Sequence, residues 1–237
     1  MTNWASCQTN GSDCSLGTSP LSDPTAPFRK QCQQGSVPSY YIDVRDKSDV
    51  QAGLAFARQH NIRLVIKNTG HDYKGRSSGP DALALWMHNV QPPLEFTESY
   101  TPEGCPAVPV GDTITFGAGQ TFRGIYDFAH QHQRVFVGGG SFSVGAAGGW
   151  ITGGGHSMLS PTKGLGVDNV QQLKAVLPNG TFITANRCQN QDLFFALRGG
   201  GGGTFGIVME MTTLVFPEQK FEASSSAPFL ISPLFEC

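Results

Sequence analysis

The chain has 237 residues, a formal net charge of −2 and 14% charged residues. Its length allows one large domain or two small ones with an ample core, and its near-neutral charge excludes recognition of nucleic acid by a basic face. No apolar run reaches the length of a transmembrane helix. The 30 glycines are clustered rather than periodic, which excludes a collagen-like chain and indicates backbone wrapped closely around a ligand.

The first part of the chain predicts an irregular segment followed by a β-α-β unit. Prolines punctuate residues 1–37. A strand is expected over residues 40–44, and a helix then opens with a capping box formed by Ser48 and Gln51 and ends near residue 60. A second strand over residues 63–67 places the next loop at the carboxyl end of a strand, where α/β folds bind ligands.

The rest of the chain alternates short elements with glycine clusters. Strands are expected over residues 82–87, 113–116, 134–137, 170–177, 181–185 and 206–215. The fourth and fifth of these form a hairpin through Pro178-Asn179-Gly180. Helices are expected over residues 122–129 and 192–198. A proline-rich excursion occupies residues 92–109, and no regular element is expected after Pro217.

Six cysteines and two glycosylation sequons bear on the cellular setting. No pair has the CxxC spacing of a zinc site, although Cys14 and Cys32 bracket a segment that a disulfide could close. The sequons are Asn10-Gly11-Ser12 and Asn179-Gly180-Thr181. Together these features slightly favour an oxidising, secretory setting, but the first ten residues lack the apolar core of a signal peptide. The localisation therefore stays open.

The most informative stretch follows the strand over residues 63–67, where the chain reads Asn68-Thr69-Gly70-His71-Asp72-Tyr73-Lys74-Gly75-Arg76-Ser77. Because Gly70 lacks a Cβ, a ligand can approach the backbone closely, and N–H groups in such a turn can cradle a pyrophosphate. His71 directly after this glycine is placed for chemistry on a bound cofactor. The alternative is a loop histidine that is hydrogen-bonded to its own turn.

Other ligand motifs are excluded. No glycine run has the strand position and the later acidic residue that a dinucleotide-binding Rossmann fingerprint requires, and none ends in the Gly-Lys-Ser/Thr of a Walker A loop. The spacing of His71, His88 and His156 matches no metal motif, so no metal site is expected.

Four segments in order resemble the signatures of fungal FAD-linked oxidoreductases, in the berberine-bridge-enzyme-like branch of the vanillyl-alcohol oxidase superfamily. One glycine motif would be weak, but four in family order are specific. The segments are residues 68–77, 148–157, 164–170 and 192–201. The resemblance implies an α+β fold, a PCMH-type FAD-binding domain of two small α/β subdomains over residues 38–216, between irregular segments at 1–37 and 217–237.

The resemblance also implies FAD as the cofactor, bound covalently from its 8α-methyl group to His71. Further residues would wrap the pyrophosphate, lie along the cofactor or approach its adenine end. This implied set comprises Asn68, Thr69, Gly70, Asp72, Tyr73, Gly75, Arg76, Ser77, Gly139, Gly140, Ser141, Val144, Gly145, Gly148, Gly149, Gly153, Gly154, Gly155, His156, Asp168, Asn169, Val170, Gly206, Ile207 and Val208.

The sequence departs from the family pattern in two ways. Some members attach flavin a second time through a cysteine at the position of Ser141, and a hydroxyl cannot replace the more nucleophilic thiolate. A single attachment is therefore expected. Family enzymes also continue into a substrate-binding domain that supplies the general base, whereas this sequence stops at Cys237. The catalytic residues therefore stay unassigned, and a partner chain that supplies the domain is one option.

The activity implied by the resemblance is hydride transfer from a small-molecule C–H donor to flavin, followed by reoxidation by dioxygen. Two alternatives stay open. The chain could be a truncated or split flavin-binding fragment without turnover of its own, or a glycan- or quinone-binding module without flavin, which would be colourless. The substrate cannot be named from this sequence.

Overall fold

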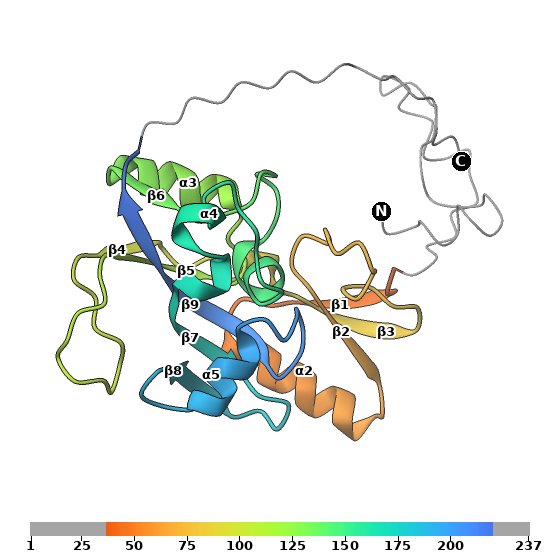
Figure 1. Ribbon diagram of the computed structural model, residues 1–237. Coiled ribbons are helices and arrows are strands. Elements are labelled where there is room, and N and C mark those ends of the chain that lie inside the picture. The colour runs from red at the N-terminus through yellow and green to blue at the C-terminus, as the bar shows by residue number, and fades with distance from the viewer. Residues whose placement is uncertain (1–36, 220–237) are drawn as a thin grey trace, which may run out of the picture.

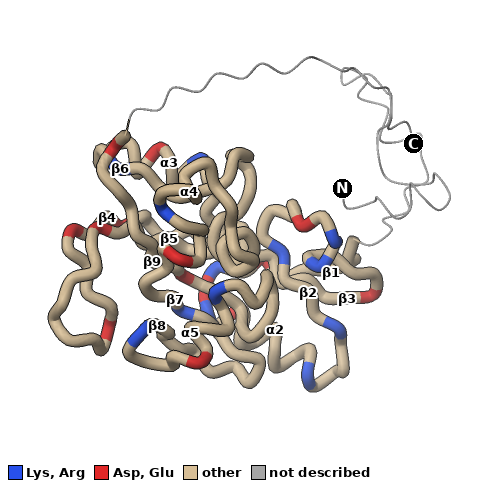
Figure 2. Tube along the Cα trace, in the orientation of Figure 1, with Lys and Arg blue, Asp and Glu red and all other residues tan. Residues whose placement is uncertain are grey.

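The computed structural model describes residues 37–219, which form two sheets with helices packed against them (Figure 1). The described residues therefore leave out the Cys14–Cys32 pair and nearly all of the two segments that were expected to be irregular. Between residues 37 and 219, no helix is both long and apolar enough to cross a membrane. Basic and acidic residues are interspersed along this part of the chain (Figure 2).

The first sheet has three parallel strands in the order β1-β3-β2. These are β1 (Tyr40–Asp43), β2 (Arg63–Lys67) and β3 (Ala82–Trp86), and helix α2 (Lys47–Gln59) connects the first two. The predicted β-α-β unit is present, and the loop with His71 follows the carboxyl end of β2 as predicted. In the sheet, β3 lies between the two strands of that unit.

The predicted capping box of α2 is wrong by two residues. The N-cap is Asp46, whose side chain accepts a hydrogen bond from the backbone N–H of Ser48 at 2.7 Å. The carboxylate of Asp49 in turn accepts from the backbone N–H of Asp46 at 3.3 Å. Aspartate caps a helix as well as serine does. The prediction chose Ser48 and Gln51 and so missed the pair Asp46 and Asp49, which begins two residues earlier.

The second sheet is antiparallel, in the order β4-β5-β9-β7-β8, with β6 also paired to β9. The long strand β9 (Ile207–Pro217) runs through its centre and confirms the expected closing strand. The remaining strands are β4 (Glu95–Thr97), β5 (Thr113–Gly117), β6 (Arg134–Phe136), β7 (Val170–Val176) and β8 (Phe182–Asn186). Two sheets of different type with interspersed helices agree with the α+β expectation.

Several short helices complete the second unit. Helices α3 (Phe122–Gln131) and α5 (Gln191–Leu197) lie where the apolar stripes predicted them. Three short helical turns and the strand β4 were not predicted, because they fall among prolines and glycines. The turns are η2 (Met87–Asn89), α4 (Ser160–Lys163) and η4 (Gly166–Asn169), while the glycine-rich segment forms one π-helical turn, η3 (Ala146–Ile151).

The two sheets share an apolar core. One buried cluster joins Val50 of α2 and Leu85 of β3 to Val176 of β7 and Met209 of β9. A larger cluster fills the second unit, between its sheet, α3 and the glycine segment. Because the first cluster draws on both sheets, the relative placement of the loops at their edges is fixed by packing.

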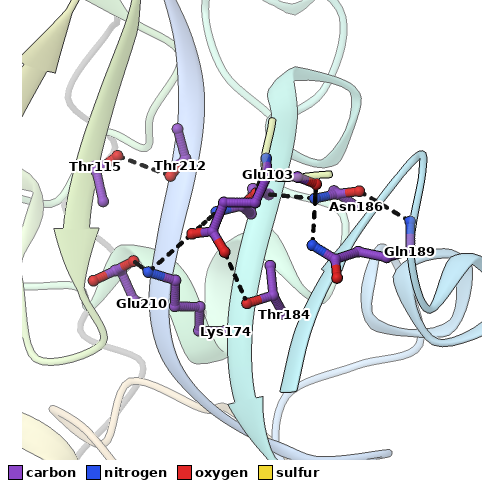
Figure 3. A network of polar contacts seen from close by, with 9 residues as sticks. Glu103, Thr115, Lys174, Thr184, Asn186, Gln189, Glu210 and Thr212 are labelled. Atoms are coloured by element: carbon purple, nitrogen blue, oxygen red, sulfur yellow. Dashed lines mark hydrogen bonds and ion pairs between the residues drawn. The ribbon is translucent and has the colours of Figure 1, made fainter. Parts of the chain in front are cut away.

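A disulfide and a buried polar network fasten the proline-rich excursion to the second sheet. Cys105 is bonded to Cys188, 83 residues further along the chain. Asn186, which is fully buried, donates from its amide to the backbone carbonyl of Glu103 and to the side chain of Gln172, each at 2.9 Å. Beside it, Lys174 lies 3.3 Å from the Glu103 carboxylate and 3.0 Å from that of Glu210 (Figure 3).

We expect the double variant Cys105→Ser/Cys188→Ser to lower the free energy of unfolding by about 2–5 kcal/mol, because the bond removes loop-closure entropy from the unfolded chain. The measurement is urea denaturation followed by tryptophan fluorescence. The slope against urea should rise as well, since an uncrosslinked chain exposes more surface on unfolding. Equal midpoints for the variant and the oxidised parent would contradict this prediction.

Candidate functional site

A cavity of about 680 Å³ opens beside the carboxyl end of β2. Its walls come from both parts of the fold. Residues of the first sheet and the loop after β2 form one side, and residues near α3 and the glycine segment form the other. The lining residues are Val37, Pro38, Tyr41, Lys67, Asn68, Thr69, His71, Ala84, Trp86, His88, Thr121 and Ser143.

His71 is exposed at the rim of this cavity. The preceding Gly70 has φ +89°, a left-handed conformation that a residue with a Cβ rarely adopts. The Nε2 atom of His71 lies 2.9 Å from the hydroxyl oxygen of Ser143, on the segment after β6. The other ring nitrogen, Nδ1, has no hydrogen-bond partner among the described residues. His71 is therefore bonded to a distant loop and not to its own turn.

Asn68 joins the two parts of the fold at the base of the cavity. Its side-chain amide donates to the backbone carbonyl of Ala118 at 2.8 Å, and its backbone carbonyl accepts from the indole N–H of Trp86 at 3.0 Å. Gly145 packs directly on the Asn68 side chain, because a Cβ at residue 145 would collide with the amide nitrogen. This contact requires glycine at position 145 and brings the glycine segment against the loop after β2.

Two buried polar atoms beside the cavity have no partner in residues 37–219. They are Oδ1 of Asn68 and Nδ1 of His88, whose ring stacks on Trp86 at a centroid distance of 5.7 Å. An unsatisfied buried polar atom costs about 1–3 kcal/mol. Both atoms are enclosed by protein, so neither is exposed to the cavity.

The loop after β2 is held rigid by an internal ion pair. Asp72 accepts from the backbone N–H of Arg76 at 2.6 Å and from its guanidinium at 2.7 Å. The side-chain hydrogen bond from Arg76 lowers the pKa of Asp72, which stays a carboxylate.

The backbone N–H groups of Gly70 and His71 have no partner within residues 37–219. The turn thus presents free donors of the kind that bind anions.

Two glycine segments approach each other next to this loop. The backbone N–H groups of Gly199 and Gly201 donate to the carbonyl of Thr152 at 3.0 and 2.9 Å. A Cβ at Gly202 would lie only 3.0 Å from the backbone of Gly148, so the two chains meet without side chains between them. A Cβ at Gly148 itself would meet open space, which leaves this backbone accessible to a ligand.

Other residues of the predicted set lie elsewhere. Tyr73 is 84% exposed, and His156 and Asp168 are exposed. The side chain of Asn169 is buried and donates to the carbonyls of Lys163 and Leu165. Val170, Ile207 and Val208 are buried in the apolar clusters. For these last four residues only the backbone is left to contact a ligand.

Two residues of the site carried no sequence signal. Ser143 has the contact to His71 described above. Tyr126 of α3 donates its hydroxyl to the carbonyl of Gly139 at 2.6 Å and so supports the loop that leads to Ser143. Burial raises the pKa of Tyr126 to about 12. Tyr126 belonged to the predicted apolar stripe of its helix, but nothing in the pattern pointed to a role for its hydroxyl.

The described residues hold no group of three or more side chains that could bind a metal ion. They instead combine a cavity, a histidine with one free ring nitrogen, the free backbone N–H groups of Gly70 and His71, and open backbone at Gly148. This arrangement suits an extended anionic ligand better than a metal.

Comparison with known proteins gives a family and several relatives. A family model described as an FAD binding domain matches residues 38–186. The FAD-linked oxidoreductase ffsJ of Aspergillus flavipes is 48% identical over 205 residues, which are 86% of this chain and 33% of that protein. The FAD-linked oxidoreductase phmC of Phaeosphaeria nodorum is 46% identical over 208 residues, 88% of this chain and 47% of that protein. The chain thus spans a third to a half of these relatives.

Solved structures give the same picture. The VAO-type flavoprotein MtVAO615 of Myceliophthora thermophila superposes with a TM-score of 0.74 at 42% identity, over 81% of this chain and 34% of that one. BBE-like 1 of Physcomitrella patens gives 0.65 at 28% identity, over 76% and 37%. The glucooligosaccharide oxidase of Acremonium strictum, described with a 6-S-cysteinyl, 8α-N1-histidyl FAD, gives 0.65 at 25% identity, over 76% and 36%.

We expect Gly145→Ala to lower the free energy of unfolding by about 1–3 kcal/mol, because the added methyl group collides with Asn68 in a packed contact. Gly140→Ala is the matched control, since a Cβ at residue 140 has no neighbour within 4 Å. Urea denaturation of both variants checks the prediction. Equal stabilities for the two alanine variants would show that the Asn68 contact does not constrain residue 145.

Proposed function

We propose that this chain, which belongs to the FAD binding domain family, holds its FAD covalently through His71 and serves an oxidase-type reaction. The relatives are FAD-linked oxidoreductases, and the similar folds include flavoproteins of the VAO type. FAD is the family cofactor, and an FAD-linked oxidoreduction is the family chemistry. The observation that carries the finer proposal is the position of His71, at the cavity rim with Nδ1 free.

The residues present fit an extended dinucleotide. The free N–H groups of Gly70 and His71 suit a pyrophosphate, and the open backbone at Gly148 lets a cofactor lie against the chain. The Arg76 guanidinium, which is paired with Asp72, lies next to the glycine run that contains Gly201.

The attachment uses the free ring nitrogen of His71. Nδ1 of His71 would hold the cofactor by a bond to its 8α carbon, which replaces one hydrogen of that carbon, with dioxygen as the two-electron oxidant that becomes peroxide. The glucooligosaccharide oxidase with a histidyl and a cysteinyl linkage supports the histidine as the attachment point. Ser141, expected at the position of the cysteine, has a hydroxyl in place of the more nucleophilic thiolate, so we propose a single linkage.

When bound, the flavin would accept a hydride from a small-molecule C–H donor and pass the electrons to dioxygen. The protein would supply position and exclude water. Asp72 is a poor candidate for the base of such a reaction, since its pairing with Arg76 lowers its pKa and weakens it as a proton acceptor. We therefore leave the base unassigned.

A second candidate is a flavin-holding unit that needs a further domain or a partner chain for turnover. It is supported by the share of the relatives that the chain spans, a third to a half. In this case the roles of His71 and the glycine segments are unchanged, and only the substrate wall and the base come from elsewhere.

We expect the flavin of the parent protein to stay with the pellet after acid precipitation, and that of His71→Ala to appear in the supernatant. The reason is that a covalent link survives denaturation, whereas hydrogen bonds to the pyrophosphate do not. Absorbance of pellet and supernatant is the measurement. His60→Ala is the control, because this exposed histidine at the end of α2 lies outside the cavity lining. Flavin that remains in the pellet of His71→Ala would overturn the proposed attachment.

A further inference from the structure

We propose, on the basis of the attachment at His71 proposed above, that Ser143 is a positioning residue that fixes the ring orientation and the tautomer of His71. The hydroxyl oxygen of Ser143 lies 2.9 Å from Nε2, and both residues line the cavity. In this assignment the Nε2–H group of His71 donates to the serine oxygen. Nδ1 then keeps its lone pair, which is what a nucleophilic nitrogen requires.

Ser143 is suited to this task because its backbone is fixed on both sides. The N–H groups of Phe122 and Arg123, at the start of α3, donate to the carbonyls of Val144 and Phe142, each at 3.1 Å. These are donors that a helix N-terminus leaves without partners inside the helix. The Arg123 guanidinium also lies over the ring of Phe142, 4.9 Å from its centroid. The serine is therefore held in place from the rigid end of a helix.

An exposed serine away from the cavity offers a comparison. Ser99 follows β4, lies outside the cavity lining, and its side chain makes no hydrogen bond within the described residues. A general effect of removing an exposed hydroxyl would appear in both serines. An effect transmitted through His71 would appear only at Ser143.

The test compares Ser143→Ala, Ser143→Thr and Ser99→Ala in the full chain. We expect FAD to bind all three, and covalent attachment to be about five- to tenfold slower in Ser143→Ala, the factor that one ordinary hydrogen bond is worth. Threonine keeps the hydroxyl and should restore the parent rate, and Ser99→Ala should match the parent. Quenched time courses of the covalent fraction give these rates.

A second readout needs no cofactor. In the protein without flavin, ¹⁵N NMR of labelled histidine reports which ring nitrogen carries the proton. We expect a fixed Nε2–H tautomer for His71 in the parent and a mixture of tautomers in Ser143→Ala. Unchanged tautomer and unchanged attachment rate in Ser143→Ala would overturn the role of Ser143. Flavin that stays covalent in His71→Ala would instead overturn the attachment itself, so the two failures are distinct.

An independent observation concerns the turn between β7 and β8. We infer that Asn179 is a site of N-linked glycosylation. Asn179 and Thr181 are both exposed, and the Asn179 side-chain oxygen accepts from the backbone N–H of Thr181 at 2.9 Å. The amide nitrogen of Asn179, which a glycan would occupy, has no partner in the described residues. A Cβ at Gly180 would meet open space, so the turn leaves room for a sugar.

The disulfide supports the same setting. Cys105 and Cys188 form a bond that persists in oxidising compartments, where asparagine glycosylation also takes place. In the reaction, the amide nitrogen replaces the pyrophosphate at the first sugar carbon of a lipid-linked oligosaccharide, and an amide proton leaves. The turn itself stays in place, because Gln51 of α2 donates to the carbonyl of Gly180 at 2.7 Å.

The test is translation of the full chain behind a secretory leader in the presence of endoplasmic-reticulum microsomes. We expect a sugar on Asn179, found as a single N-acetylglucosamine on its peptide after endoglycosidase H. This product distinguishes glycosylation from deamidation of the Asn179-Gly180 bond. Thr181→Ala should abolish it and Thr181→Ser should retain it, while Asn10→Gln controls for the other sequon. An unmodified Asn179 in translocated chains would overturn the inference.

Discussion

The contact of Asn68 with Gly145 is the constraint on which the rest of the site depends. Asn68 follows directly after β2. Its side-chain amide donates a hydrogen bond to the backbone carbonyl of Ala118, which follows β5. Because residue 145 has no side chain, the glycine segment can close onto this amide. The loop of His71 and the loop of Ser143 then meet across the boundary of the two sheets. Without that close approach the hydrogen bond between them would have no geometric basis.

The same boundary explains why the cavity has polar groups within mostly apolar walls. The shared core beneath it is built from Val50, Leu85, Val176 and Met209, which fix the sheets relative to each other. Above that core, the chain leaves the sheets in loops whose N–H and side-chain groups are not all paired within the described residues. A rigid base with unsatisfied groups at its edge is suited to bind a ligand whose own polar atoms complete the pairing.

Sequence reasoning predicted most of the strands and the location of the site, because both follow from local patterns. Alternating and helical apolar spacing identified β2, β7, β9 and α3. It missed β4 and α4, where prolines dominate the local pattern. The bond between Cys105 and Cys188 could not be predicted, since pairing across 83 residues depends on how β8 and the proline-rich excursion meet in space. The contact of Ser143 with His71 is equally non-local.

The glycine motifs illustrate what a resemblance can and cannot assign. In sequence, Gly145, Gly148 and Gly155 belong to one glycine-rich segment and look equivalent. In the structure their reasons differ. A side chain at residue 145 would strike Asn68, and one at 155 would strike the indole of Trp150, whereas one at 148 would meet open space. Gly145 and Gly155 are therefore required by the fold itself. Gly148, in contrast, leaves backbone accessible to a ligand because it has no side chain. A substitution at Gly148 therefore tests the binding of cofactor without disturbing the packing that stabilises the protein.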